Sequence, residues 1–278
     1  MNPVSRVGPP AVRFVRQRVW PRLGHKLAVD LTRRYPPSGE VFQTREPSGM
    51  RLQCDLRDEL SWNLYYVGTA DAGVRAWMQS WLRPGDTYVD VGAHIGSLVS
   101  VAVDAVGPTG RVVAFEPGTQ TYAKLARAAS TARWPIIEAH RAAVGAAPGT
   151  ASFHVPVAAA QSSRATLVGA DGFNAVETVE VETVDGTLGS ASVRLLKIDV
   201  EGYERSVLEG ATRTLTNTDA LLLEINPTAL AHAGTDGDDL LALLSAFVPH
   251  TINGSGQLTP VDRLVPEGEY MDVAFLRA

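Results

Sequence analysis

Three short segments of the 278-residue sequence carry side chains whose types and spacing could bind a nucleoside. Asp90 precedes the glycine turn Gly92-Ala-His-Ile-Gly96, and Glu116 follows 20 residues after Gly96. Glycines let the backbone approach a ligand and leave N–H groups free at the start of a helix. An acid ~20 residues beyond such a turn can accept hydrogen bonds from both ribose hydroxyls. These segments therefore predict an adenosine site.

Three further polar residues follow two apolar runs later in the chain. Asp199 comes directly after the run 193–198, while Glu224 and Asn226 lie at the end of the run 220–225. Ligands of a doubly wound sheet bind beyond the carboxyl ends of its strands. We therefore expect these side chains to share one rim with Asp90 and Glu116.

The elements that must position these residues alternate between strand and helix patterns. Residues 87–91 read Thr-Tyr-Val-Asp-Val, a short strand, and apolar residues at helical spacing follow over 98–106. Residues 111–115 form the next apolar strand, and the runs 193–198 and 220–225 suit parallel strands covered on both faces. The pattern predicts an α/β fold, a Rossmann-like, doubly wound, mostly parallel sheet with an N-terminal helical arm and a β insert.

The insert and the C-terminus complete this prediction. Residues 151–157 and 176–184 read as strands around a polar loop at 158–174. The chain then predicts a helix over 238–247 and a final strand over 271–276, which we expect to pair antiparallel.

Charge divides the chain into two parts of opposite sign. Residues 1–36 carry eight basic side chains and one acid, a net +7, so the overall −5 leaves −12 on residues 37–278. We predict a basic arm over 1–60 and a Rossmann-like domain over 61–278. Folding of the arm onto the acidic body is favoured over contact with a membrane surface. The acidic body argues against nucleic-acid binding.

Composition limits the compartment and the fold class further. Cys54 is the single cysteine, so the sequence contains neither an internal disulfide nor a zinc-finger spacing. The apolar runs are shorter than the ~20 residues that span a bilayer. We expect a cytoplasmic globular protein.

The glycine turn distinguishes between two adenosine ligands. It lacks the full G-x-G-x-x-G pattern of dinucleotide sites, because His94 occupies a glycine position. S-adenosylmethionine (AdoMet) has no pyrophosphate, and its amino and carboxylate groups require an acid and backbone N–H groups. The turn therefore favours AdoMet. A nicotinamide-dependent oxidoreductase and a non-catalytic binding protein on a methyltransferase fold remain the alternatives.

Four ordered motifs resemble the FkbM-type AdoMet-dependent methyltransferases. They are Asp86-Thr-Tyr-Val-Asp-Val-Gly-Ala-His-Ile-Gly96, Ala114-Phe-Glu-Pro117, Leu196-Lys-Ile-Asp-Val-Glu-Gly-Tyr-Glu204 and Leu223-Glu-Ile-Asn226. The resemblance implies a class I methyltransferase fold and O-methyl transfer to a hydroxyl of a sugar, glycolipid, natural product or other small molecule.

The resemblance also implies roles for individual residues. Asp199 is the expected general base, with Glu201 next on the same turn. Asp199, Glu224 and Asn226 could bind Mg²⁺, which prefers oxygen ligands and lowers the pKa of a bound hydroxyl. His94 replaces a common Asn, and Asp71 a common Glu. The expected cofactor-binding residues are Asp71, Asp90, Gly92, His94, Gly96, Glu116 and Pro117.

Overall fold

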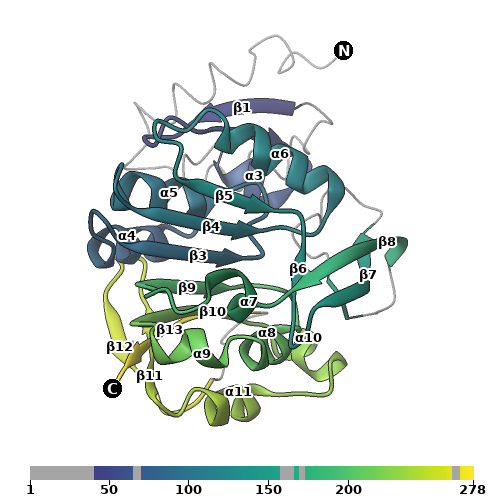
Figure 1. Ribbon diagram of the computed structural model, residues 1–278, viewed down its shortest axis with the longest axis vertical. Helices are drawn as coiled ribbons and strands as arrows, with labels where there is room; N and C mark the ends of the chain where they lie inside the picture. The colour runs from purple at the N-terminus through teal and green to yellow at the C-terminus, as the bar shows by residue number, and fades with distance from the viewer. Residues whose placement is uncertain (1–40, 65–69, 157–165, 169–172, 265–269) are drawn as a thin grey trace, which may run out of the picture.

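An eight-stranded sheet crosses the middle of the computed structural model, which describes residues 41–64, 70–156, 166–168, 173–264 and 270–278 (Figure 1). Within the described residues its order is β12-β11-β13-β10-β9-β3-β4-β5. Five neighbouring strands are parallel, which confirms the prediction for the runs 193–198 and 220–225: β3 (Thr87–Val91), β4 (Arg111–Phe115), β5 (Ile137–His140), β9 (Leu195–Ile198) and β10 (Ala220–Ile225).

The strand order reverses at β3, which places the candidate site. β3 pairs with β4 on one side and with β9 on the other. The connections after β3 and β9 leave opposite sides of this point, so a crevice forms beyond their carboxyl ends. The predicted fold class, a Rossmann-like and mostly parallel α/β sheet, is confirmed.

Two layers of helices cover the sheet because alternate strand residues face opposite sides. In β3, Tyr88 packs into one buried cluster and Val89 into the other. The Tyr88 side of the sheet is covered by α4 (Ala72–Trp81), α5 (Ser97–Val106) and α6 (Thr119–Ala129). The Val89 side is covered by α7 (Val184–Leu188), α8 (Glu204–Glu209), α9 (Thr212–Thr216), α10 (Pro227–His232) and α11 (Gly237–Leu243).

The C-terminal part confirms one prediction and corrects another. The final strand β13 (Met271–Arg277) pairs antiparallel with β10, as expected. The helix predicted over 238–247 ends earlier, because Phe247 begins β11 (Phe247–Ile252), which pairs with β13 and with β12 (Leu258–Pro260). Apolar residues of a short buried strand and of a buried helix give the same sequence signal.

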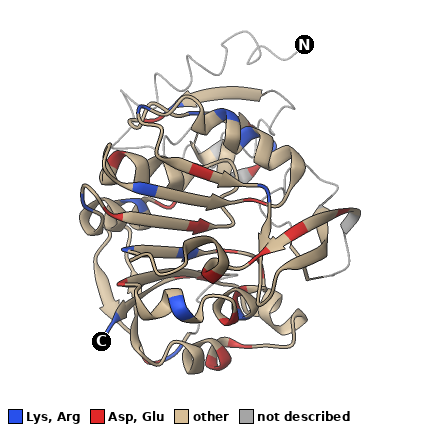
Figure 2. Cartoon of the chain, viewed as in Figure 1, with Lys and Arg blue, Asp and Glu red and all other residues tan. Residues whose placement is uncertain are grey.

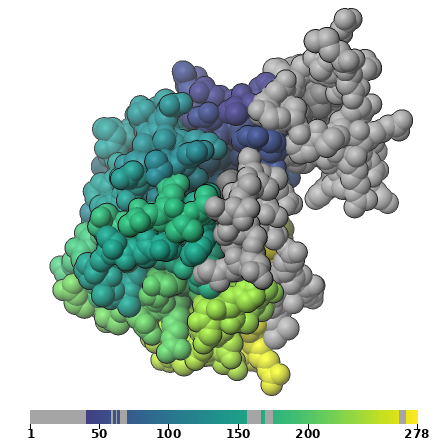
Figure 3. All heavy atoms as spheres, turned by 90° about the vertical axis from the view of Figure 1, so that its right-hand side faces the viewer, coloured from purple at the N-terminus to yellow at the C-terminus, as the bar shows by residue number. Residues whose placement is uncertain are grey.

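An N-terminal hairpin extends the core beyond the predicted domain boundary. β1 (Val41–Arg45) pairs antiparallel with β2 (Arg51–Asp55), which the short helix α3 (Glu59–Trp62) follows. Leu52 and Cys54 are fully buried in the cluster that contains α5 and α6. Figure 3 shows this hairpin in purple at the opposite end of the body from the yellow C-terminus. Residues 41–56 therefore pack with the body, while the predicted basic segment 1–36 lies outside the described residues.

The insert forms a second sheet beside the crevice. Its strands are β6 (Ala143–Val144), β7 (Gly149–Pro156) and β8 (Phe173–Glu182), in the order β6-β8-β7. Glu177 of β8 accepts hydrogen bonds from Thr119 N (3.0 Å) and Oγ1 (2.7 Å) at the start of α6. Figure 2 shows basic residues on α6 and acidic residues on β8. Both predicted insert strands are present, and most of the predicted loop lies outside the described residues. No described helix has the length and apolar character needed to cross a membrane.

Candidate active site

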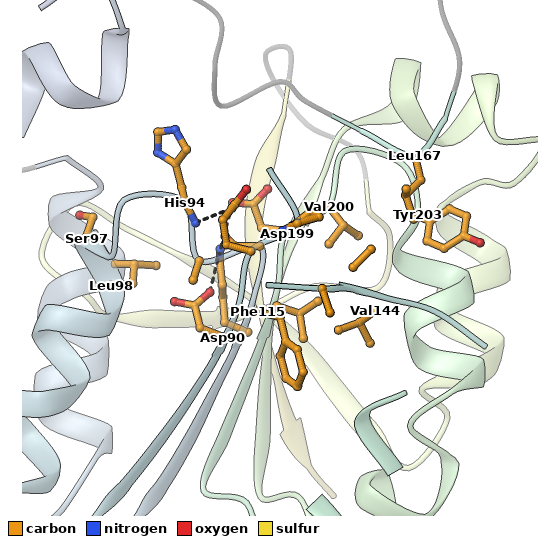
Figure 4. Close-up of a pocket in the computed structure, with 18 of the residues that line it drawn as sticks. Asp90, His94, Ser97, Leu98, Phe115, Val144, Leu167, Asp199, Val200 and Tyr203 are labelled. Atoms are coloured by element: carbon orange, nitrogen blue, oxygen red, sulfur yellow. Dashed lines mark hydrogen bonds and ion pairs between the residues drawn. The ribbon is translucent and has the colours of Figure 1, made fainter. Parts of the chain in front are cut away.

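A pocket of about 890 Å³, counted with its open mouth, lies beyond the carboxyl ends of β3, β4 and β9 (Figure 4). Four predicted site residues do not line it: Gly96, Glu201, Glu224 and Asn226. The structure brings together the others along its wall: Asp71, Asp90, Gly92, His94, Glu116, Pro117 and Asp199.

The glycine turn approaches the strand-end acid very closely. Gly92 has φ 83°, and a Cβ atom added there would lie 1.9 Å from the carbonyl oxygen of Asp199. Gly92 N and Ala93 N both donate to Phe115 O, at 3.0 and 2.9 Å. The expectation that this turn leaves its N–H groups free for a ligand is therefore wrong for these two residues, because β4 already accepts their hydrogen bonds.

The first turn of α5 offers a different set of donors. Its N-cap is Gly96, which supplies no side-chain cap, and Ser97 and Leu98 line the pocket. The first N–H groups of a helix have no partner within the helix and carry a partial positive charge. Gly96 itself serves packing, since an added Cβ would lie 3.0 Å from Leu125 and 3.1 Å from Met50. The start of α5 is therefore the part of the pocket with donors that could bind an anion.

A buried lysine links the two sides of the crevice. Lys197 Nζ lies 2.6 Å from Gly92 O, 3.1 Å from Asp90 Oδ1 and 3.2 Å from Asp199 Oδ2. Asp90 also accepts a hydrogen bond from the Tyr88 hydroxyl at 3.0 Å. Burial disfavours the ammonium, but Asp199 and Asp90 outweigh it and raise the pKa of Lys197 above its usual range.

Lys197 is a site residue that sequence reasoning missed. It lines the pocket, although only 7% of its side chain is exposed. The sequence could have identified it, because Lys197 is one of only three lysines and lies inside an apolar run predicted to be a parallel strand. A charged residue in such a strand is buried and needs partners of opposite charge.

Glu116 is held by backbone donors on both carboxylate oxygens. His94 N donates to Oε2 and Gly118 N to Oε1, each at 3.0 Å. Burial raises the pKa of Glu116 to about 7 despite these two hydrogen bonds. Each carboxylate oxygen can accept a second hydrogen bond, so Glu116 retains the capacity to bind two hydroxyls.

His94 contributes through its backbone. Its φ is 50°, a left-handed conformation in which its N–H faces Glu116. The imidazole points away from Asp90 (Figure 4). Burial lowers the pKa of His94, so its ring is neutral near pH 7.

The other end of the pocket is apolar. Phe115 at the end of β4 and Phe153 of the insert both line it. Figure 4 shows Val144, Leu167 and Tyr203 on the side of the pocket away from Ser97 and Leu98. A flat aromatic ligand group can bury its faces here, because these side chains present carbon atoms and no charge.

The turn after β9 separates the two predicted catalytic carboxylates. Asp199 faces the pocket, with 31% of its side chain exposed. Glu201 has φ 52° and lies outside the pocket lining, where its Oε2 accepts from Asn226 Nδ2 at 3.2 Å. The buried Glu204 accepts from Gly202 N at 3.1 Å and fixes this turn. The geometry thus favours Asp199 over Glu201 as the group that reaches a bound ligand.

Three further acidic side chains interact electrostatically with Asp199. Asp71 has φ 52° at the start of α4 but makes no capping hydrogen bond, and burial and Asp199 raise its pKa. Glu224 lies directly opposite Asp272 in the β10–β13 register. Burial, together with Asp199 and Asp272, raises the pKa of Glu224 to about 10. Burial, followed by Asp71 and Asp199, raises that of Asp272 to about 7.

The predicted magnesium ligands gain no support from this arrangement. Asn226 Oδ1 accepts from Ala229 N at 3.2 Å and caps α10, while its Nδ2 donates to Glu201. Across the residues that the structure describes, no group of three or more His, Cys, Asp and Glu side chains could hold a metal ion. The Mg²⁺ site at Asp199, Glu224 and Asn226 stays a prediction.

Replacing Glu224 by glutamine is expected to stabilise the protein above about pH 5. The pKa of Glu224 is about 10 in the folded protein against an ordinary value of 4.5, so folding takes up a proton between these limits. Wild-type stability therefore falls as pH rises through this window, and an uncharged glutamine removes that loss. We expect a gain of ~1 to 3 kcal/mol at pH 8 and little gain at pH 4.5. Urea unfolding at both pH values measures it, and an equal gain at both would contradict this origin.

Comparisons with known proteins agree with the geometry. A family model described as the methyltransferase FkbM domain matches residues 90–248. Hexuronic acid methyltransferase AglP of Haloferax volcanii is 28% identical over 160 residues, which are 58% of this chain and 62% of that protein. The chain thus matches less than two thirds of this relative's length.

Solved methyltransferase structures are more distant. An FkbM methyltransferase from Methylobacillus flagellatus is 16% identical, with a TM-score of 0.42, over 77% of this chain and 52% of that one. A SAM-dependent O-methyltransferase from Thermotoga maritima is 15% identical, with a TM-score of 0.42, over 90% of this chain and 82% of that one.

Proposed function

Because the chain belongs to the FkbM methyltransferase family, we propose that this AdoMet-dependent methyltransferase methylates a hydroxyl oxygen of a sugar or sugar-containing small molecule. The observation that carries the proposal is the position of Asp199. Its carboxylate is partly exposed at the pocket wall, and Lys197 holds one of its oxygens. Such a fixed carboxylate can accept the proton that an alcohol loses when its oxygen is methylated.

The pocket offers a complementary group for each part of AdoMet. Glu116 would accept the ribose hydroxyls, and the apolar end around Phe115 and Phe153 would hold the adenine. The uncapped start of α5 would bind the carboxylate of the methionine portion. Asp90 would attract its ammonium group, and Asp71 adds negative charge to the part of the pocket that would hold the methionine portion. The match to the FkbM family model favours AdoMet over the nicotinamide alternative.

Alignment and proton removal are the contributions of the protein to the reaction. AdoMet supplies a methyl group activated by its sulfonium. The protein must hold the acceptor oxygen in line with that methyl group, which makes a bimolecular reaction effectively unimolecular. Lys197 holds Asp199 Oδ2, so the other oxygen, Oδ1, is the proposed proton acceptor.

The acceptor is proposed from the named relative and from the charge of the pocket. AglP is named as a hexuronic acid methyltransferase, which supports a sugar acceptor for this chain. Asp71, Asp199 and the nearby Asp272 would repel a carboxylate acceptor. We therefore propose a hydroxyl as the methylated group, giving a methyl ether rather than a methyl ester.

Incubation with methyl-labelled AdoMet tests this function. The acceptors are methyl hexopyranosides, methyl hexuronosides and their oligosaccharides, and S-adenosylhomocysteine (AdoHcy) release is measured alongside label in the product. Mild hydroxide releases label from an ester as methanol and leaves an ether intact. Hydroxide-stable label supports the proposal, whereas label lost to hydroxide would assign the carboxylate as the methylated group.

Replacing Glu116 by glutamine is expected to weaken AdoMet binding about 10- to 100-fold at pH 8, because a charge-assisted acceptor for the ribose is lost. The pKa of Glu116 is about 7 in the ligand-free protein. If AdoMet binds the carboxylate, wild-type affinity falls as pH drops below 7, since a proton must first be removed. Calorimetric titration from pH 5.5 to 8.5 measures both effects. The Glu116→Gln variant should lose this pH dependence. An AdoMet Kd equal to that of wild type would show that Glu116 is not part of the site.

A further inference from the structure

We infer that Asp71 makes this pocket select the cationic sulfonium of AdoMet over the neutral thioether of its product, AdoHcy. The inference rests on the proposed function, in which the Asp71 and Asp199 end of the pocket holds the methionine portion. It assigns one residue, Asp71, the role of distinguishing the methyl donor AdoMet from its product AdoHcy. The argument depends on which charges around the pocket already have partners.

The described lining of the pocket is strongly unbalanced in charge. Lys197 is its one lysine or arginine, and the imidazole of His94 is neutral because burial lowers its pKa. The acids of the lining are Asp71, Asp90, Glu116 and Asp199.

Lys197 attracts Asp71 only through space and forms no direct bond with it. Its ammonium has three N–H donors, and three acceptors lie within 3.2 Å of Nζ: Gly92 O, Asp90 and Asp199. The lysine therefore balances part of the charge of Asp90 and Asp199. Its side chain has no donor left for a third carboxylate or for a ligand.

Arg75 is the other cation that influences Asp71, and it is also engaged. Its guanidinium lies 2.8 Å from Glu46 Oε2 and donates to Ser97 O and Oγ at 3.3 Å. Arg75 N donates to the backbone carbonyl of Asp71 at 2.9 Å, but the Asp71 carboxylate forms neither a hydrogen bond nor an ion pair with the part of the chain that the structure describes. Asp71 has exposed surface, yet the protein atoms around its carboxyl group desolvate it; this desolvation, followed by the carboxylate of Asp199, raises the pKa of Asp71.

A cationic ligand group relieves this imbalance, and methyl transfer removes that cation. AdoMet carries a carboxylate, an ammonium and a sulfonium, a net +1. Loss of the methyl group leaves AdoHcy with a net charge of zero. A carboxylate near the sulfur therefore stabilises the donor more than the product. The consequence is weaker product inhibition, because the spent donor leaves a pocket that prefers the cation.

The experiment compares ligand selectivity rather than affinity alone. Calorimetric titration with AdoMet and with AdoHcy gives the ratio of their Kd values for wild type, Asp71→Asn and the control Asp104→Asn. Asp104 is exposed on α5, so its substitution makes the same charge change away from the pocket. Asparagine tolerates the left-handed backbone of Asp71, which keeps the fold intact. Sinefungin, which carries an amine in place of the methylated sulfur, is the third ligand.

We expect Asp71→Asn to reduce the preference for AdoMet over AdoHcy about five- to tenfold. Sinefungin should lose affinity together with AdoMet, and Asp104→Asn should match wild type. Equal weakening of AdoMet and AdoHcy would overturn the inference, because it would mean that Asp71 binds the ammonium common to both. Asp71→Glu restores the charge and should restore the ratio. Failure of both ligands to bind wild type would instead refute the proposed function.

Discussion

Replacement of Asp199 by asparagine is expected to lower kcat by about 10²- to 10⁴-fold, the contribution typical of a general base. The amide keeps the size of the side chain but cannot accept a proton. AdoMet affinity should change less than about tenfold, because in the proposed binding mode Glu116, the apolar end and the start of α5 contribute most of the binding. Single-turnover kinetics with the acceptor identified above, together with calorimetry, separates the two effects.

Two comparisons make this result specific to Asp199. Asp104→Asn, on the exposed face of α5, should retain wild-type turnover. Glu201→Gln should cost much less than Asp199→Asn, because Glu201 lies outside the pocket and is bound by Asn226. A larger loss in Glu201→Gln would transfer the role of base to Glu201. Survival of turnover in Asp199→Asn would remove the carboxylate from the mechanism.

Strand-end positions could be predicted from the sequence because they depend on local patterns. The run at β3 and the spacing to Glu116 placed Asp90 and Glu116 at one rim, and the structure brings them together with Asp199. Hydrogen-bond partners could not be predicted in this way. Whether Gly92 N is free depends on Phe115 O, which belongs to the neighbouring strand.

Contacts between segments that are far apart in the sequence explain the other features that the sequence did not predict. The segment 51–55 alternates exposed and buried residues, a strand pattern, but its burial depends on α6 and not on its neighbours in the chain. Asp272 interacts electrostatically with Asp71 and Asp199 from outside the pocket lining, because β13 places it opposite Glu224. An antiparallel register cannot be derived from either strand alone.

Replacement of Gly92 by alanine is expected to lower the free energy of unfolding by about 3 kcal/mol or more and to abolish AdoMet binding. The added Cβ would lie 1.9 Å from Asp199 O, so the β3 turn and the β9 turn must separate. Separation also breaks the contact of Lys197 with Gly92 O, which holds both sides of the crevice. Urea unfolding and calorimetry measure the two losses.

Gly85 provides the control that separates crowding from backbone strain. Its φ is 92°, close to the 83° of Gly92, but an added Cβ would meet only Thr109 Oγ1 at 3.8 Å. Gly85→Ala therefore carries the left-handed penalty of ~1 to 2 kcal/mol without the collision, and should bind AdoMet normally. Equal losses in the two variants would show that strain alone explains Gly92. A greater loss in Gly92→Ala would show that the site requires the backbones of the two turns to touch, which only a residue without a side chain permits.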